Sequence, residues 1–137
     1  KGGELTRSQI EAGADVVYAA AGGTGPGVYQ AAADMGVLAI GVDDNQNYLQ
    51  PGTMLTSMYK LVDDAAYESY SNAMNGTWSS DARVLGVAEN GVGYAMDEYN
   101  ADLVSADMIA AAEAARDAII AGDIVVHDYM SDNSCPL

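Results

Sequence analysis

Two polar turns carry the residues of this sequence that are best suited to chemistry. Gly22-Gly23-Thr24-Gly25 directly follows one apolar run, and Asp43-Asp44-Asn45-Gln46 directly follows another. Glycines let a ligand approach the backbone closely and expose N–H donors at a helix start. A carboxylate such as Asp43 can accept two hydrogen bonds from a vicinal diol. Together the turns predict a site for a neutral, polyhydroxylated ligand, although each one also suits an ordinary strand-to-helix connection.

A second candidate for the site is Lys60, the only lysine after Lys1. It follows the apolar stretch 54–59, which leaves two interpretations open. The ammonium group reaches into the polar site, or the side chain lies along apolar surface with its charged end in water. The sequence favours neither.

The elements that must position these residues alternate between strand-like and helical patterns. Short apolar runs predict buried strands, whereas longer segments that end at glycine or Asn-Gly predict helices. The predicted strands are 15–21, 37–42, 53–58, 83–88 and 124–126, and the predicted helices are 4–12, 28–35, 61–74 and 106–121. The alternation predicts an α/β fold, a parallel sheet flanked by helices. Ligands bind outside the carboxyl ends of such strands, so Gly22 and Asp43 are expected at the same edge of the sheet.

The charge balance restricts the class of ligand. Twenty acidic residues and five basic residues give a formal charge of −15. Such a field repels phosphate backbones and anionic lipid, so we expect no nucleic-acid partner.

Catalytic, metal and cofactor sites are not expected. The single cysteine, Cys135, and the single histidine, His127, lie near the end of the chain, where a surface role is expected for both. No serine stands in a nucleophile elbow, and no Gly-Lys-Ser/Thr completes a P-loop. A dinucleotide-binding G-x-G-x-x-G that starts at Gly23 has Val28 in its third glycine position. The sequence therefore predicts a non-enzymatic protein without a cofactor.

Three stretches together resemble the basic membrane lipoprotein family, the purine nucleoside receptors of bacterial ABC transporters. They are GADVVYAAAGGTGPGVYQAA (13–32), IGVDDNQNYLQPGTMLTSMYKLVD (40–63) and NGVGYAMDEYN (90–100). The resemblance implies a type I periplasmic-binding fold, in which two α/β lobes close about a hinge on a ligand. It also implies that this chain covers mainly the second, C-terminal lobe.

The resemblance assigns roles to four residues. Gly22 and Gly23 would line the cleft between the lobes, Asp43 would hold the ribose hydroxyls, and Lys60 would reach the ligand from a crossing strand. Tyr29 stands where the family often has phenylalanine, which preserves packing if its hydroxyl finds a partner.

The resemblance also implies a division of the chain. Residues 1–57 would belong to the second lobe, and residues 58–86 would form a hinge crossing and a helix of the first lobe. Residues 87–137 would contain the return crossing, more of the second lobe and a C-terminal tail. The helix at 61–75 should therefore leave apolar residues such as Leu61, Ala65 and Ala66 for a lobe that lies largely outside this sequence.

The implied partners are a purine nucleoside, the membrane permease of an ABC transporter and the missing N-terminal half of the same protein. The implied location is the periplasm or the outer face of the cytoplasmic membrane, with a lipid anchor on an upstream cysteine.

The main alternative is the small-molecule sensor domain of a LacI-type transcription regulator. That class shares the fold and places a Gly-x-Asp-Asp turn before a threonine-rich crossing strand, as in residues 41–44 and 55–57. The Gly-Gly-Thr-Gly turn and the Gly-Val-Gly segment at 91–93 favour the transport family.

Overall fold

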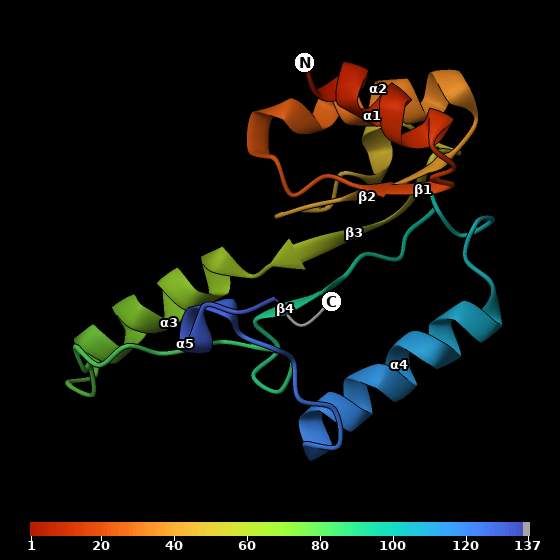
Figure 1. The fold of residues 1–137 in the computed structure, drawn as a ribbon. Helices are drawn as coiled ribbons and strands as arrows, with labels where there is room; N and C mark the ends of the chain where they lie inside the picture. The colour runs from red at the N-terminus through yellow and green to blue at the C-terminus, as the bar shows by residue number, and fades with distance from the viewer. Residues whose placement is uncertain (136–137) are drawn as a thin grey trace. The chain divides into compact units, whose positions relative to one another are not determined.

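The computed structural model describes residues 1–135, which form two compact units. The first unit is Lys1–Ser105 and the second begins at Ala106 (Figure 1). The elements of the first unit are α1 (Gly2–Glu11), β1 (Val16–Tyr18), η1 (Gly22–Thr24), α2 (Gly25–Met35), β2 (Leu38–Gly41), η2 (Asn47–Leu49), β3 (Met54–Lys60), α3 (Val62–Met74) and β4 (Val92–Tyr94). The second unit contains α4 (Ala106–Ala121) and α5 (Tyr129–Asp132).

The four strands form one mixed, mostly parallel sheet in the order β1-β2-β3-β4. β1 pairs with β2 in parallel, with Tyr18 opposite Ile40, and β2 pairs with β3 in parallel. The α/β fold with a parallel sheet flanked by helices is confirmed, as is the adjacent parallel pairing of the first two predicted strands. Gly22 and Asp43 therefore follow neighbouring strands at the same edge of the sheet. β4 is antiparallel to β3, because the chain leaves the sheet through α3 and returns beside the strand it left.

Helices α1 and α2 pack against each other over β1 and β2 (Figure 1). α2 begins with Pro26 in its first turn, where proline costs no hydrogen bond. It ends at Gly36, whose φ of 70° allows a left-handed cap. The core beneath these helices contains Val17, Ala19, Val28, Tyr29, Ala32, Ala39 and Met54. Small alanines on α2 let the helix approach the sheet closely.

The predicted strand at 83–88 is wrong. This segment instead leads into a turn that the Gly91 N–H closes on the Gly86 carbonyl at 2.9 Å. The Glu89 carboxylate strengthens the turn by accepting from the Gly86 N–H at 2.9 Å. Local hydrogen bonds thus take the backbone groups of Gly86 that a strand would offer to the sheet, and the strand forms later, at β4.

The predicted strand at 124–126 is also wrong. Its residues are exposed: Val125 keeps 85% of its surface accessible to solvent. They form an irregular segment between α4 and α5. The adjoining helix α4 spans the predicted residues, 106–121, and Gly122 follows it with a φ of 82°. A run of three apolar residues without a neighbouring strand to bury it cannot form a ladder.

Helix α3 leaves a large apolar surface open, as expected. No residue of α3 is buried within the part of the chain that the structure describes. Leu61 and Ala65 are half-buried and Ala66 is exposed. The large exposed side chains are Val62, Tyr67, Tyr70 and Met74, of which Met74 retains 90% of its surface. Among residues 1–135, none of the helices combines the length and apolar character required to cross a membrane.

Candidate functional site

Asp43 and Lys60 form an ion pair at the carboxyl ends of β2 and β3. The Lys60 ammonium donates to Asp43 Oδ1 at 2.7 Å, and the Lys60 backbone N–H donates to the Asp43 carbonyl at 3.1 Å. The hydrogen bond to Asp43, followed by its negative charge, raises the pKa of Lys60 above its ordinary value. Lys60 thus reaches the polar turn that contains Asp43, whereas its contact with a ligand stays a prediction. Each side chain keeps about half of its surface exposed, so water and solutes reach both charges.

The backbone of Asp43 has an unusual conformation. Its φ is 74°, in the left-handed region. That region costs a non-glycine residue roughly 1–2 kcal/mol, less for aspartate than for most residues. A conformation of this kind persists where surrounding contacts hold it, and such residues cluster at ligand-binding sites.

The glycine turn leads from β1 into α2 at the same edge of the sheet. Gly22 has a φ of 53°, which a residue with a side chain rarely adopts. Within the described residues, a Cβ added at Gly22 or Gly23 meets no atom within 4 Å. The backbone here is open to a ligand, and the structure brings Gly22, Gly23, Asp43 and Lys60 to one edge.

Tyr18 is a residue of this edge to which the sequence analysis assigned no role. It ends β1, is 53% exposed, and is close enough to Lys60 and Tyr29 to affect the pKa of both. An exposed aromatic ring beside polar groups is suited to stacking on a flat ligand. The sequence could have indicated this role, because Tyr18 ends the strand that leads into the glycine turn.

A buried polar network fixes the loop that follows Asp43. The Ser57 hydroxyl donates to Asn47 Oδ1 at 2.7 Å and accepts from the Gln46 N–H at 3.0 Å. Asn47 and Ser57 are both fully buried. Buried polar groups are costly unless they are hydrogen-bonded. These bonds therefore hold the loop against β3.

Glycine is required beside this network at Gly41. A Cβ added to Gly41 would lie 2.5 Å from Ser57 Oγ, closer than van der Waals contact allows. The glycine of the Gly-Val-Asp motif thus makes room for the serine that holds the loop.

Asp97 completes the network from the turn that follows β4. Its Oδ2 accepts from Asn45 Nδ2 at 2.7 Å and from Asn47 Nδ2 at 3.1 Å, and its Oδ1 accepts from the Tyr99 N–H at 2.9 Å. The hydrogen bond from Asn45 is the main cause that holds the pKa of Asp97 below its usual value. The turn is anchored in addition by the buried Asn100, which donates to the Leu55 carbonyl at 2.9 Å.

Tyr29 ties the same loop to α2. Its ring is buried, and its hydroxyl donates to Gln46 Oε1 at 2.6 Å. Burial raises the pKa of this phenol. The condition for tyrosine to replace phenylalanine here, a partner for the hydroxyl, is therefore met.

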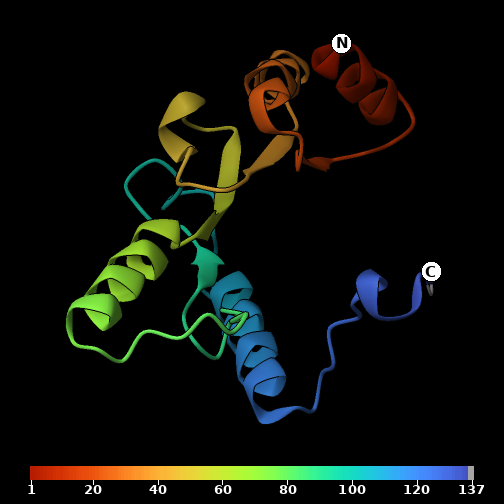
Figure 2. The ribbon, with the colours of Figure 1, turned by 90° about the vertical axis from the view of Figure 1, so that its left-hand side faces the viewer.

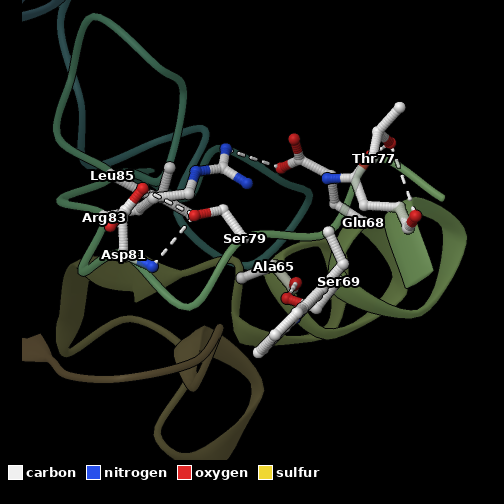
Figure 3. A pocket seen from close by; sticks show the side chains of 10 residues that line it. Ala65, Glu68, Ser69, Thr77, Ser79, Asp81, Arg83 and Leu85 are labelled. Carbon is white, nitrogen blue, oxygen red and sulfur yellow. Dashed lines mark hydrogen bonds and ion pairs between the residues drawn. The ribbon is translucent and has the colours of Figure 1, made fainter.

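A pocket of about 530 Å³ lies elsewhere in the first unit, between α3 and the chain that follows it (Figure 3). Arg83 donates to Glu68 at 3.0 Å across it, and this hydrogen bond, together with the opposite charges, lowers the pKa of Glu68 and raises the pKa of Arg83. Ser79 donates to Asp81 at 2.6 Å on the same wall. The lining residues are Ala65, Glu68, Ser69, Asn72, Thr77, Trp78, Ser79, Asp81, Arg83 and Leu85, none of which belongs to the edge that carries Asp43.

The second unit contains the histidine and the cysteine. His127 lies 3.0 Å from the Ser134 carbonyl and 3.4 Å from the Asp132 carboxylate, and Cys135 is exposed. Among residues 1–135, no group of three or more histidine, cysteine and acidic side chains is arranged to hold a metal ion.

The profile of one protein family matches residues 1–129, and that family is described as ABC transporter substrate-binding protein PnrA-like. Among curated proteins, basic membrane protein D of Borreliella burgdorferi is 34% identical over 63% of this chain and 26% of its own length. The CD4+ T-cell-stimulating antigen of Listeria monocytogenes is 30% identical over 92% of this chain and 39% of its own length.

Solved structures share the fold. A solute-binding protein of an ABC transporter system from Aeropyrum pernix superposes with a TM-score of 0.77 at 23% identity, over 95% of this chain and 45% of that one. A crystal structure described as a transcriptional activator of the comK gene from Bacillus halodurans has a TM-score of 0.78 at 25% identity, over 90% of this chain and 43% of that one.

The chain thus spans about two fifths or less of the length of these curated relatives. The match in sequence extends over most of the chain and includes the motifs that carry Gly22, Asp43 and Lys60. The chain belongs to the family of PnrA-like ABC transporter substrate-binding proteins.

Proposed function

We propose that this chain forms part of the ligand site of an extracytoplasmic substrate-binding protein that takes a purine nucleoside. The observation that carries the proposal is the Asp43–Lys60 ion pair, open to solvent beside the glycine turn. An acceptor and a donor 2.7 Å apart match the two neighbouring hydroxyls of a ribose. Asp43 accepts the hydroxyl protons, and Lys60 donates to the hydroxyl oxygens.

The surroundings of the pair favour a nucleoside over a nucleotide. Tyr18 offers an aromatic face for the base, and the backbone at Gly22 and Gly23 leaves room for the sugar. The formal charge of −15 opposes a phosphate, and the one ammonium group at this edge is already paired with Asp43.

The division of the chain between two lobes is part of the same proposal. Residues 1–57 belong to the C-terminal lobe, and residues 58–86 include a hinge crossing and a helix of the N-terminal lobe. Residues 87–137 contain the return crossing, more of the C-terminal lobe and a C-terminal tail. The exposed apolar side chains of α3 support this division, because they need a cover that residues 1–135 do not supply. Closure of the lobes on the nucleoside creates the form that a membrane permease recognises. A lipid anchor upstream holds the protein at the outer face of the membrane.

Calorimetric titration of the complete protein tests the proposal. We expect inosine, guanosine or adenosine to bind, and the corresponding nucleoside monophosphates to bind much more weakly. Free hexoses and NAD serve as competing classes in the same experiment. Binding of a hexose without a response to nucleosides would support the regulator-type sensor instead, and a preference for NAD would indicate a dinucleotide site.

Removing the cation of the pair gives a second test. We expect Lys60→Met to weaken inosine binding by about 10-fold, because the ribose loses a charged donor. Methionine keeps the length and apolar character of the side chain, so packing is preserved. The matched control is Arg7→Met, since Arg7 is as exposed as Lys60 and pairs with Asp34 at 3.1 Å on the helices. Equal affinities in wild type and Lys60→Met would remove Lys60 from the site.

A further inference from the structure

Asp97 lies outside the proposed ligand contacts but is bonded to the loop that contains them. Two asparagine side chains, Asn45 and Asn47, donate to the same carboxylate oxygen at 2.7 and 3.1 Å. These residues follow Asp43 by two and four positions. Asp97 itself is 50 or more residues away in the sequence, in the turn after β4. It is therefore a tertiary clamp on the loop.

The loop is held from two sides. On one side, Ser57 of β3 bonds to Asn47 and to the Gln46 N–H. On the other side, Asp97 binds the side chains that project from the loop. Asn45 in turn accepts from the Asn47 N–H at 3.0 Å, so the bond to Asp97 also fixes the local turn.

Asp43 depends on this clamping more than an ordinary residue does. Its φ of 74° is one that the chain does not retain without support from its surroundings. We expect a movement of residues 45–47 to turn the Asp43 carboxylate as well, because the two segments are continuous in the chain. Displacements of about 1 Å at a binding group are sufficient to lose a well-formed hydrogen bond.

We propose that Asp97 is a positioning residue: its carboxylate holds the 43–47 loop and thereby sets the orientation in which Asp43 meets the ligand. The inference rests on the proposed function, because Asp43 is the ligand contact through which Asp97 acts. A carboxylate is required for this role. The Asn45 and Asn47 amides and the Tyr99 N–H all donate to Asp97, and both of its oxygens accept, which an amide cannot reproduce. The depressed pKa of Asp97 agrees with an ionised group at neutral pH.

The test is a double-mutant cycle in the complete protein, with inosine as the probe. Asp97→Asn is expected to weaken inosine binding by about 10-fold in the wild-type background. In an Asp43→Gly background, the same substitution is expected to change the affinity by less than about 2-fold, because the residue through which Asp97 acts is gone. The control is Asp102→Asn, an exposed aspartate in the same turn, which should leave the affinity unchanged in both backgrounds. Unchanged affinity in a folded Asp97→Asn protein would overturn the proposal, as would an equal loss in both backgrounds.

A ligand-independent measurement separates this inference from the proposed function. Hydrogen exchange should accelerate in peptides that contain residues 43–47 in Asp97→Asn but not in Asp102→Asn, with far-UV circular dichroism unchanged. If the wild type binds no nucleoside, the proposed function fails, and the exchange result still decides whether Asp97 holds the loop. Unchanged exchange at 43–47 would overturn the positioning role whatever the ligand is.

Discussion

Replacing Asp43 with glycine in the complete protein is expected to weaken purine nucleoside binding by about 10- to 100-fold. In the proposed site the carboxylate accepts the hydrogen bonds of the ribose hydroxyls, and a hydrogen bond to a charged group is stronger than one between neutral groups. Glycine removes the carboxylate and still adopts the φ of 74° without strain. Calorimetric titration with inosine measures the loss.

Two further substitutions separate the charge from the backbone at this position. Asp43→Asn should be milder than Asp43→Gly, because the amide oxygen still accepts and asparagine tolerates the left-handed region. Asp43→Ala should bind as weakly as Asp43→Gly and also lower stability, because alanine is strained there.

The control for this series is Asp34→Ala, which removes a similarly exposed carboxylate that pairs with Arg7. It should leave the affinity for inosine unchanged. If Asp43→Gly binds inosine as wild type does, Asp43 is not a ligand contact, while the family assignment is unaffected.

The second large effect is expected on stability. Asn47→Ala should lower the free energy of unfolding by about 1–3 kcal/mol, because the buried Ser57 hydroxyl then donates into a space without an acceptor. Both residues are fully buried, so water does not readily replace the lost amide. Urea unfolding of the complete protein, followed by circular dichroism, measures the difference.

The matched control is Asn45→Ala. Asn45 donates to the same oxygen of Asp97, at 2.7 Å, but its side chain is exposed, so water can take its place. This variant should cost less than about 1 kcal/mol. Equal losses in the two variants would mean that burial of Asn47 does not decide the stability of the loop.

Much of the fold was predictable because its signals are local. The alternation of apolar runs with segments that end at glycine identified β1, α2, β2, β3 and α4. The rule for parallel sheets then predicted that Gly22 and Asp43 share an edge. Errors arose where a short apolar run had no fixed partner. At 83–88 the carbonyl of Gly86 bonds to the Gly91 N–H in a turn instead of to a strand. At 124–126 the described residues include no neighbouring strand.

By itself, the sequence determined the fold class, the family and the two turns that form the candidate site, since each depends on patterns that are local, within a single element, turn or motif. The tertiary structure decided the rest. It placed the end of the Lys60 side chain beside Asp43, because the reach of a long side chain depends on what lies near its end. It also revealed the clamp of Asn45, Asn47 and Asp97, because that clamp joins segments about 50 residues apart. Such a contact leaves no periodic signal in the sequence; it exists only when β3 and β4 bring the two segments together (Figure 2).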